Sequence, residues 1–152
     1  MANSESVGVV VLGNASPPTV LSARKHPGFP MKLHASLPKG TCVVPPFGRI
    51  AIPTGITVVL PDLIEAHVVA PRSWDEMQPL SILNSPGTID PDYRGEIHAI
   101  LINLSQGDVS IEHGQEIAEL RLARFVRVQI SSIEEFQPTE RGMNGLGSTG
   151  TN

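Results

Sequence analysis

The chain contains little of what disulfide-bonded, zinc-binding or membrane-spanning proteins require. Cys42 is the only cysteine among 152 residues, which excludes an intrachain disulfide and a zinc site built from several cysteines. No apolar run is long enough for a membrane span, and the N-terminal residues do not form a basic leader before an apolar core. These absences predict a soluble intracellular protein, cytoplasmic or nuclear, with Cys42 as a small buried apolar side chain.

Aromatic residues are also scarce, at 4% of the sequence, so a hydrophobic core has to be built from Val, Ile and Leu. Hydrophobic residues amount to 40%, which is enough for one modest core. Glycine and proline number 14 each, a composition typical of many short strands joined by turns. The length fits a single domain.

Acidic residues are missing between Glu5 and Asp62, although the net charge of the whole chain is −4. The cations in this stretch are Arg24, Lys25, Lys32, Lys39 and Arg49. The negative net charge gives no indication of nucleic-acid binding. Two interpretations of the basic stretch are open: a chance run on a solvated surface, or a positive wall that faces a polyanionic ligand.

Short apolar runs recur along the chain, most of them bounded by Gly, Pro, Asn or Asp. The runs that predict strands are Val9–Leu12, Thr41–Val44, Arg49–Ile52, Ile56–Leu60, Glu65–Val69, Leu80–Leu83, Glu96–Asn103, Val109–Ile111 and Glu116–Phe125. From Ala118 to Ile130 apolar and polar residues largely alternate, which is the period of a strand. Ile97–Ile102 is apolar on both faces except at His98, so we expect a second sheet or another subunit to cover it. Such strands predict one all-β domain, a sandwich or a barrel.

One short helix also fits the sequence. Ser73 and Glu76 have the spacing of a capping box, and Pro79 follows closely. The N-terminus of such a helix would favour a phosphate group. A simple connecting turn fits the same residues, so the fold prediction allows at most one short helix.

The segment Arg141–Gly150 has four glycines, one arginine and two hydroxyl side chains, and no continuous apolar face. One interpretation is a disordered tail, which is common at chain ends. The other is a flexible arm that closes its backbone amides, Arg141, Ser148 and Thr149 around an anion. On the second interpretation, residues 1–136 form the β domain and residues 137–152 form a mobile arm that closes a ligand site.

A Ser-Pro-Gly turn signal at positions 85–87 lies between two apolar runs and predicts a hairpin. The backbone of a rigid hairpin can present donors and acceptors to a nucleobase, and such a site rejects other bases by leaving polar groups unpaired. Asp90 follows, where a carboxylate can act as a general base on water; an ordinary surface turn explains Asp90 as well. For Tyr93, the ordinary alternative to a functional role is that of a half-buried packing residue. The five histidines lack metal-ligand spacing, and His98 is expected in the core or at an interface.

Two motifs give the chain a family resemblance. Gly87–Glu96 reads Gly-Thr-Ile-Asp-Pro-Asp-Tyr-Arg-Gly-Glu, and the C-terminal segment keeps Arg141 and the frame Gly147–Gly150. In these stretches, and more loosely in Ala70–Ser73 and Gly114–Leu120, the chain resembles the deoxyuridine triphosphatase (dUTPase) family. That family carries five short motifs in fixed order, and the resemblance covers residues 20–150.

The resemblance implies a β-barrel or sandwich of the β-clip type, assembled as a homotrimer with nucleotide sites at the subunit interfaces. It implies hydrolysis of dUTP to dUMP and pyrophosphate, with Asp90 activating the attacking water and Mg²⁺ bound through the substrate phosphates. Tyr93 would pack on the deoxyribose and leave no room for a 2′-hydroxyl. The implied substrate-binding residues are Lys32, Arg72, Ser73, Asn84, Gly87, Thr88, Ile89, Tyr93, Glu119, Arg141, Leu146, Gly147, Ser148 and Thr149.

The chain departs from the family pattern in one segment and at three single positions. After Ser73 the family usually continues with small or apolar residues, whereas this chain has Trp74-Asp-Glu76. Lys32 stands where the first motif has an aspartate linked through water to magnesium, Glu119 replaces a glutamine, and Leu146 replaces the aromatic residue that covers the base. Lys32 is expected to contact the triphosphate as a point charge, and Lys32 and Glu119 are expected to compensate each other. An active enzyme and a weakly active or inactive nucleotide-binding protein with a regulatory protein partner both fit the sequence. A relative acting on another deoxynucleotide, such as dCTP, has less support.

Overall fold

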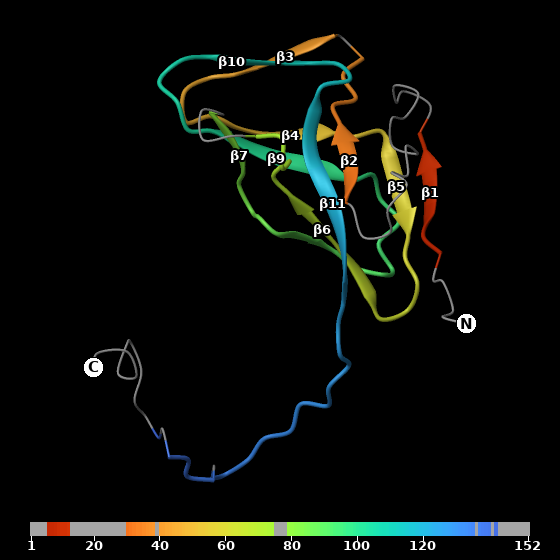
Figure 1. Cartoon of the computed structure of the whole chain (residues 1–152), viewed down its shortest axis with the longest axis vertical. Coiled ribbons are helices and arrows are strands. Elements are labelled where there is room, and N and C mark those ends of the chain that lie inside the picture. Colours follow the sequence, from red (N-terminus) through yellow and green to blue (C-terminus); the bar gives the residue numbers. More distant parts are fainter. Residues whose placement is uncertain are drawn as a thin grey trace.

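The computed structural model describes residues 6–12, 30–38, 40–74, 79–135, 137–140 and 142. Within these ranges the chain forms strands and no helix (Figure 1), so the predicted all-β fold is confirmed. The strands are β1 Gly8–Val11, β2 Met31–His34, β3 Thr41–Val44, β4 Arg49–Pro53, β5 Ile56–Val59, β6 Ile64–Val69, β7 Leu80–Ile82, β8 Gly87–Ile89, β9 His98–Asn103, β10 Val109–Glu112 and β11 Glu116–Arg124. The described segments include no helix of the length and apolarity that crossing a membrane requires.

Pairing between strands that are far apart in sequence builds four antiparallel sheets. The largest has the order β2-β11-β6-β8, and a second has the order β4-β9-β7; β1-β5 and β10-β3 form two-stranded sheets. Figure 1 shows β11 running through the middle of the molecule, beside β2 and β6. Because the strands divide among several sheets, the architecture is a sandwich of sheets and not one closed barrel.

Alternation along β6 shows how the sequence selects the buried face. Ile64, Ala66 and Val68 are buried, while the side chains between them are half buried, as expected for a strand with one face on the core. The core is aliphatic and consists of Leu33, Ala35, Val44, Ile52, Ile56, Val58, Leu60, Ala66, Val68, Leu80, Ile82, Ile97, Ala99, Leu101, Ile111, Ile117, Ala118 and Leu120. Cys42 packs against this core but is only half buried, so its predicted burial is correct only in part.

The sequence pattern does not predict β2 or β8, whereas the predicted strand Glu116–Phe125 corresponds to β11. β2 has four residues and β8 has three, of which the first is a glycine, so neither shows enough alternation to be recognised. β11 ends at Arg124, although the alternation continues to Ile130. Beyond Arg124 no strand of the described chain lies alongside, and Val126 and Val128 are exposed.

The predicted hairpin at positions 85–87 is wrong. β7 pairs with β9 in the three-stranded sheet, whereas β8 pairs with β6 in the four-stranded sheet. The connection between β7 and β8, which contains a cis peptide bond between Ser85 and Pro86, therefore carries the chain from one sheet to the other. A turn signal marks where the chain changes direction, but it does not determine which strand becomes the neighbour.

β9 is fully covered on one face only. Ala99 and Leu101 are buried, Ile100 and Ile102 are half buried, and His98 is exposed. The expectation of a core position for His98 is therefore wrong in the single chain. Cover of the second face by another subunit remains a prediction.

The predicted short helix falls partly outside the described residues, which omit positions 75–78. Ser73 and Trp74 lie in a turn, in which the Trp74 N–H donates to Pro71 O at 3.0 Å. The connecting turn is thus present at the start of this segment, and the capping interaction with Glu76 is not tested.

The turn between β3 and β4 leaves no room for a side chain at position 48. Gly48 N–H donates to Pro45 O at 2.9 Å, and a Cβ at position 48 would lie 2.8 Å from that same oxygen. We expect Gly48→Ala to lower the free energy of unfolding by about 1–3 kcal/mol, because the clash is with backbone. Gly107→Ala is the matched control, since a Cβ there meets nothing within 4 Å; its expected change is within about 0.5 kcal/mol. Urea denaturation measures both, and equal stability of the two variants would contradict this description of the turn.

Candidate functional site

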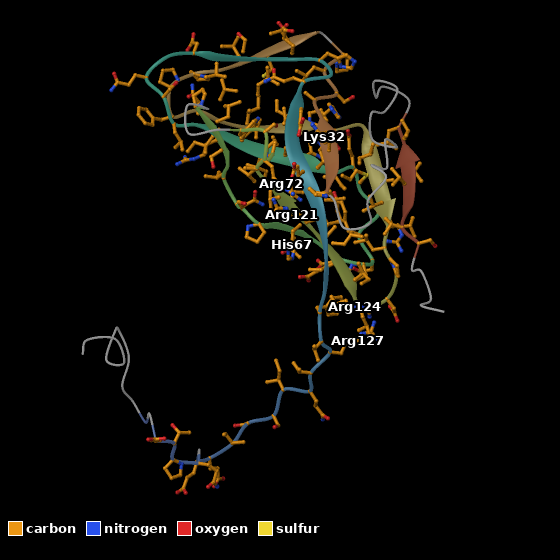
Figure 2. All side chains as sticks on the ribbon, viewed as in Figure 1. Lys32, His67, Arg72, Arg121, Arg124 and Arg127 are labelled. Carbon is orange, nitrogen blue, oxygen red and sulfur yellow. The ribbon has the colours of Figure 1, made fainter. Side chains whose placement is uncertain are left out.

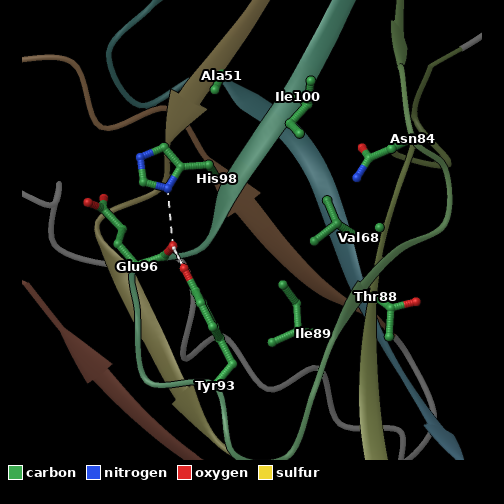
Figure 3. Close-up of a pocket in the computed structure, with 10 residues that line it drawn as sticks. Ala51, Val68, Asn84, Thr88, Ile89, Tyr93, Glu96, His98 and Ile100 are labelled. Atoms are coloured by element: carbon green, nitrogen blue, oxygen red, sulfur yellow. Dashed lines mark hydrogen bonds between the residues drawn. The ribbon is translucent and has the colours of Figure 1, made fainter.

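A pocket of about 210 Å³ lies between the two larger sheets. Its lining residues are Ala51, Val68, Asn84, Gly87, Thr88, Ile89, Tyr93, Glu96, His98 and Ile100. β6 and β8 of the four-stranded sheet contribute to it, as do β4 and β9 of the three-stranded sheet (Figure 3). The chain passes between these sheets before β8 and again after it, so both connections border the pocket.

Asn84 and Gly87 meet on one side of the pocket. A Cβ built on Gly87 would lie 3.0 Å from Asn84 Nδ2 and 3.5 Å from the Cβ of Val68. The missing side chain of Gly87 therefore allows the Asn84 amide to lie close to the main chain of β8. Asn84 thus offers both a hydrogen-bond donor and an acceptor beside the pocket.

Tyr93 lies over Gly95 and is held from two directions. Its main-chain N–H donates to Asp90 O at 3.1 Å, and its hydroxyl donates to Glu96 O at 3.0 Å. A Cβ on Gly95 would lie 2.3 Å from the Tyr93 hydroxyl oxygen, so this ring position requires glycine. The Tyr93 side chain is 43% exposed and lines the pocket, where its ring offers a flat apolar surface to a ligand.

Asp90 follows β8 directly and begins the turn that carries Tyr93. Asp90 is exposed and lies next to Ile89, which lines the pocket. Arg94 braces the turn, because its guanidinium donates to Pro91 O at 2.7 Å and to Tyr93 O at 2.9 Å. A carboxylate on a braced turn beside a pocket is suited to accept a proton from a ligand-bound water.

A second group of charged side chains lies at Glu119 on β11 and includes Arg72 and Arg121, both labelled in Figure 2. Glu119 is 5% exposed, and its Oε1 accepts a hydrogen bond from the Arg72 N–H at 3.1 Å. Its Oε2 lies 3.6 Å from Arg72 Nε and 3.5 Å from a guanidinium nitrogen of Arg121. Two guanidinium groups offset the charge of this buried carboxylate, and the exposed turn that carries Arg72 and Ser73 is tied to β11.

The expected pairing of Lys32 with Glu119 is wrong. The two residues are opposite each other on β2 and β11, but the Lys32 ammonium donates to Glu116 Oε2. The ladder is irregular between Glu116 and Ala118, and such an irregularity re-aims side chains relative to a regular strand. Lys32 is therefore neutralised by Glu116, and Glu119 by the two arginines.

The described residues do not fit a protein-held metal ion. No group of three or more His, Cys, Asp or Glu side chains among them is arranged to hold one. Lys32 brings an ammonium group, and its neighbour His34 has a lowered pKa because of burial; Glu116 opposes this lowering and Lys32 reinforces it.

The single chain keeps the two groups of side chains apart. Of the predicted site residues, Asn84, Gly87, Thr88, Ile89 and Tyr93 line the pocket, whereas Lys32, Arg72, Ser73, Asp90 and Glu119 are not among its lining residues. The remaining predicted residues, Arg141, Leu146, Gly147, Ser148 and Thr149, lie outside the described part of the chain. At the base of the predicted arm, Gly142 N–H donates to Thr139 O at 3.0 Å.

Three residues around Tyr93 have roles that the sequence pattern does not reveal. Gly95 leaves room for the ring, Glu96 supplies a main-chain carbonyl, and the His98 ring donates to that carbonyl. Every residue type has a main-chain carbonyl, so neither composition nor spacing predicts which carbonyl accepts these hydrogen bonds. The proximity of Gly95 to Tyr93 in the sequence is the one available signal.

The dUTPase family profile matches residues 32–150 of this chain. The deoxyuridine 5′-triphosphate nucleotidohydrolase of Treponema pallidum is 43% identical over 119 residues, which are 78% of this chain and 81% of that relative. The enzyme of the same name from Hydrogenobaculum is 45% identical over 109 residues, which are 71% of this chain and 75% of that relative.

Solved structures agree in fold. The dUTPase of Staphylococcus bacteriophage 80alpha with dUpNHpp has a TM-score of 0.81 at 22% identity and covers 97% of this chain and 100% of that chain. A mutant dUTPase from phage phi11 of S. aureus, in which a structural Mg(II) ion is coordinated, has a TM-score of 0.73 at 19% identity. That comparison covers 87% of this chain and 99% of the phage chain. The fold, the family profile and the curated relatives agree, and the chain belongs to the dUTPase family.

Proposed function

We propose that this chain hydrolyses dUTP to dUMP and pyrophosphate. In the proposed step Asp90 accepts a proton from water, the water oxygen bonds to the α-phosphorus, and the bond to the bridging oxygen breaks so that pyrophosphate leaves. Family membership supports this reaction. The observation that carries it is the position of Tyr93 over Gly95 beside the pocket, three residues after Asp90. We place the activity inside the cell, in the cytoplasm or nucleus.

The proposed roles follow from where the side chains lie. The Asn84 amide and the main chain of β8 would bind the uracil edge, with Thr88 and Ile89 as walls. Tyr93 would pack on the deoxyribose, where its fixed ring leaves no room for a 2′-hydroxyl. Lys32 and Glu119 on the four-stranded sheet, together with Arg72 and Ser73 on the turn that follows β6, would form the phosphate-binding region. Closure of the arm would bring Arg141, Ser148 and Thr149 to the γ-phosphate, with Leu146 and Gly147 over the base.

Hydrolysis of dUTP in water labelled with heavy oxygen tests the reaction. Attack on the α-phosphorus places the labelled oxygen in dUMP and leaves pyrophosphate unlabelled. Label in pyrophosphate, or release of dUDP and phosphate, would contradict the proposed step. Mass spectrometry of the two products distinguishes these results.

We further propose that the chain acts as a homotrimer. The pocket residues and the phosphate-binding residues are separate in one chain, and a second chain would supply the missing half. Beyond β11 the chain runs away from the β domain (Figure 1) and exposes apolar side chains, namely Val126 at 82%, Val128 at 73%, Ile130 at 92% and Ile133 at 70%. Such a segment is suited to burial against another copy. Light scattering should give three times the chain mass of 16.2 kDa; a monomer with full activity would contradict the proposal.

Magnesium is proposed to enter with the triphosphate and to be held through its oxygens, where it would neutralise phosphate charge. The donor set around Lys32 supports this, because it presents an ammonium group and carboxylates already paired with cations. Binding of Mn²⁺, followed by its electron spin resonance, should therefore be weak for the chain alone and clear for the complex with dUpNHpp. Tight Mn²⁺ binding to the chain alone would contradict a substrate-held ion.

A further inference from the structure

The carbonyl oxygen of Glu96 is an acceptor shared by two side chains of the pocket. Tyr93 Oη lies 3.0 Å from it and His98 Nδ1 lies 3.1 Å from it (Figure 3). A carbonyl oxygen can only accept, and it has two lone pairs. Both side chains therefore donate, and the His98 ring must carry its hydrogen on Nδ1.

The peptide group between Glu96 and Ile97 is fixed from its other side. The Ile97 N–H donates to Ile56 O on β5 at 2.9 Å. The Glu96 carboxylate is anchored nearby, since its Oε1 accepts a hydrogen bond from Gly55 N–H at 2.7 Å. With the N–H bound to β5, the carbonyl of the same planar group points the opposite way, toward Tyr93 and His98.

We propose that His98 is a positioning residue that holds Tyr93 in the orientation required to discriminate deoxyribose from ribose. This inference rests on the proposed function, in which Tyr93 packs on the sugar. His98 occupies the second lone pair of Glu96 O and restricts the tilt of that peptide, and with it the acceptor to which the Tyr93 hydroxyl is bound. The absence of a side chain at Gly95 leaves room for the Tyr93 ring. His98 holds in place the Glu96 carbonyl that accepts the hydrogen bond of the Tyr93 hydroxyl. Because His98 acts through Glu96, it changes sugar selectivity without contacting the reacting atoms.

Substitution of His98 tests the effect on selectivity. His98→Ala should lower the ratio of kcat/KM for dUTP to that for UTP about fivefold, the effect of one neutral hydrogen bond. His98→Asn should stay within about twofold of the wild type, because its amide N–H can donate from nearly the position of Nδ1. An unchanged ratio in His98→Ala, or an equal loss in both variants, overturns the inference.

A double substitution separates positioning from general loosening of the pocket. In Tyr93→Phe the hydroxyl is gone, so His98→Ala should cause no further change in the dUTP to UTP ratio. A further fall in this ratio overturns the inference. The wild-type chain is assayed first. If it does not turn over dUTP, the proposed function fails. The position of the hydrogen on the His98 ring then still tests the hydrogen bond from His98 Nδ1 to Glu96 O.

The histidine tautomer gives a readout that does not depend on activity. At about pH 8, above the ordinary pKa of a free histidine side chain, a long-range nitrogen–hydrogen NMR spectrum should show the hydrogen of His98 on Nδ1. His113 is an internal reference with the opposite assignment, because its Nδ1 accepts a hydrogen bond from Leu37 N–H at 3.0 Å. The His98→Asn variant identifies the signal by its loss. A hydrogen on Nε2 of His98 overturns the inference.

Discussion

Asp90→Asn is expected to lower kcat for dUTP by at least about 100-fold, because an amide cannot accept the proton of the attacking water. Binding of dUpNHpp should stay within about threefold of the wild type, since the substitution keeps the size of the side chain. The turn itself should persist. It is held by the Tyr93 N–H to Asp90 O contact at 3.1 Å and by Arg94 to Pro91 O at 2.7 Å, which do not involve the substituted group.

Asp92→Asn is the matched control for this prediction. Asp92 lies in the same turn, is exposed and carries the same charge, but it has no role in the proposed step. Its kcat should remain within about twofold of the wild type. Equal losses in the two variants would show that the charge of the turn, and not a proton acceptor at position 90, controls turnover.

Gly95→Ala is expected to lower kcat/KM for dUTP by about 10- to 100-fold, the effect of displacing a substrate-positioning group by about 1 Å. The new Cβ would lie 2.3 Å from Tyr93 Oη and 2.5 Å from Tyr93 Cζ. The ring has to move away and its hydroxyl then leaves Glu96 O, to which it now donates at 3.0 Å. Preference for dUTP over UTP should fall together with the activity.

Two comparisons show whether the loss in Gly95→Ala passes through Tyr93. Gly107→Ala adds the same methyl group where nothing lies within 4 Å and should leave turnover unchanged. In a Tyr93→Ala background, Gly95→Ala should have little further effect, because the ring it displaces is absent. Full activity of Gly95→Ala alone would mean that the position of the Tyr93 ring does not matter for the reaction.

Those parts of the fold that depend on local alternation are predictable from the sequence. The alternation predicts a strand over Glu65–Val69, and β6 spans Ile64–Val69 because its apolar side chains face the core at every second position. The partners of strands are not predictable in this way. The turn signal at positions 85–87 correctly predicts a change of direction. The turn nevertheless connects two sheets, because β8 pairs with β6 and the register joins Val68 to Gly87 and Ala66 to Ile89.

The candidate site is likewise predictable from the sequence only in part. Asn84, Gly87 and Tyr93 lie within ten residues of one another, and the structure places them around one pocket. The partner of Lys32 was not predictable, because it depends on an irregularity in β11 that makes Glu116, and not Glu119, its partner. His98 escapes prediction for another reason, since it acts on a main-chain oxygen that no residue type reveals.

Pyrophosphate release by the purified chain of 152 residues is the most direct test of the proposed activity. The chain is offered dUTP, dCTP, dTTP and UTP in turn, each with and without Mg²⁺. We expect release from dUTP alone among the four, faster with Mg²⁺ present. Binding of dUTP without any release would contradict the proposed activity and would indicate a nucleotide-binding protein that has kept the dUTPase fold.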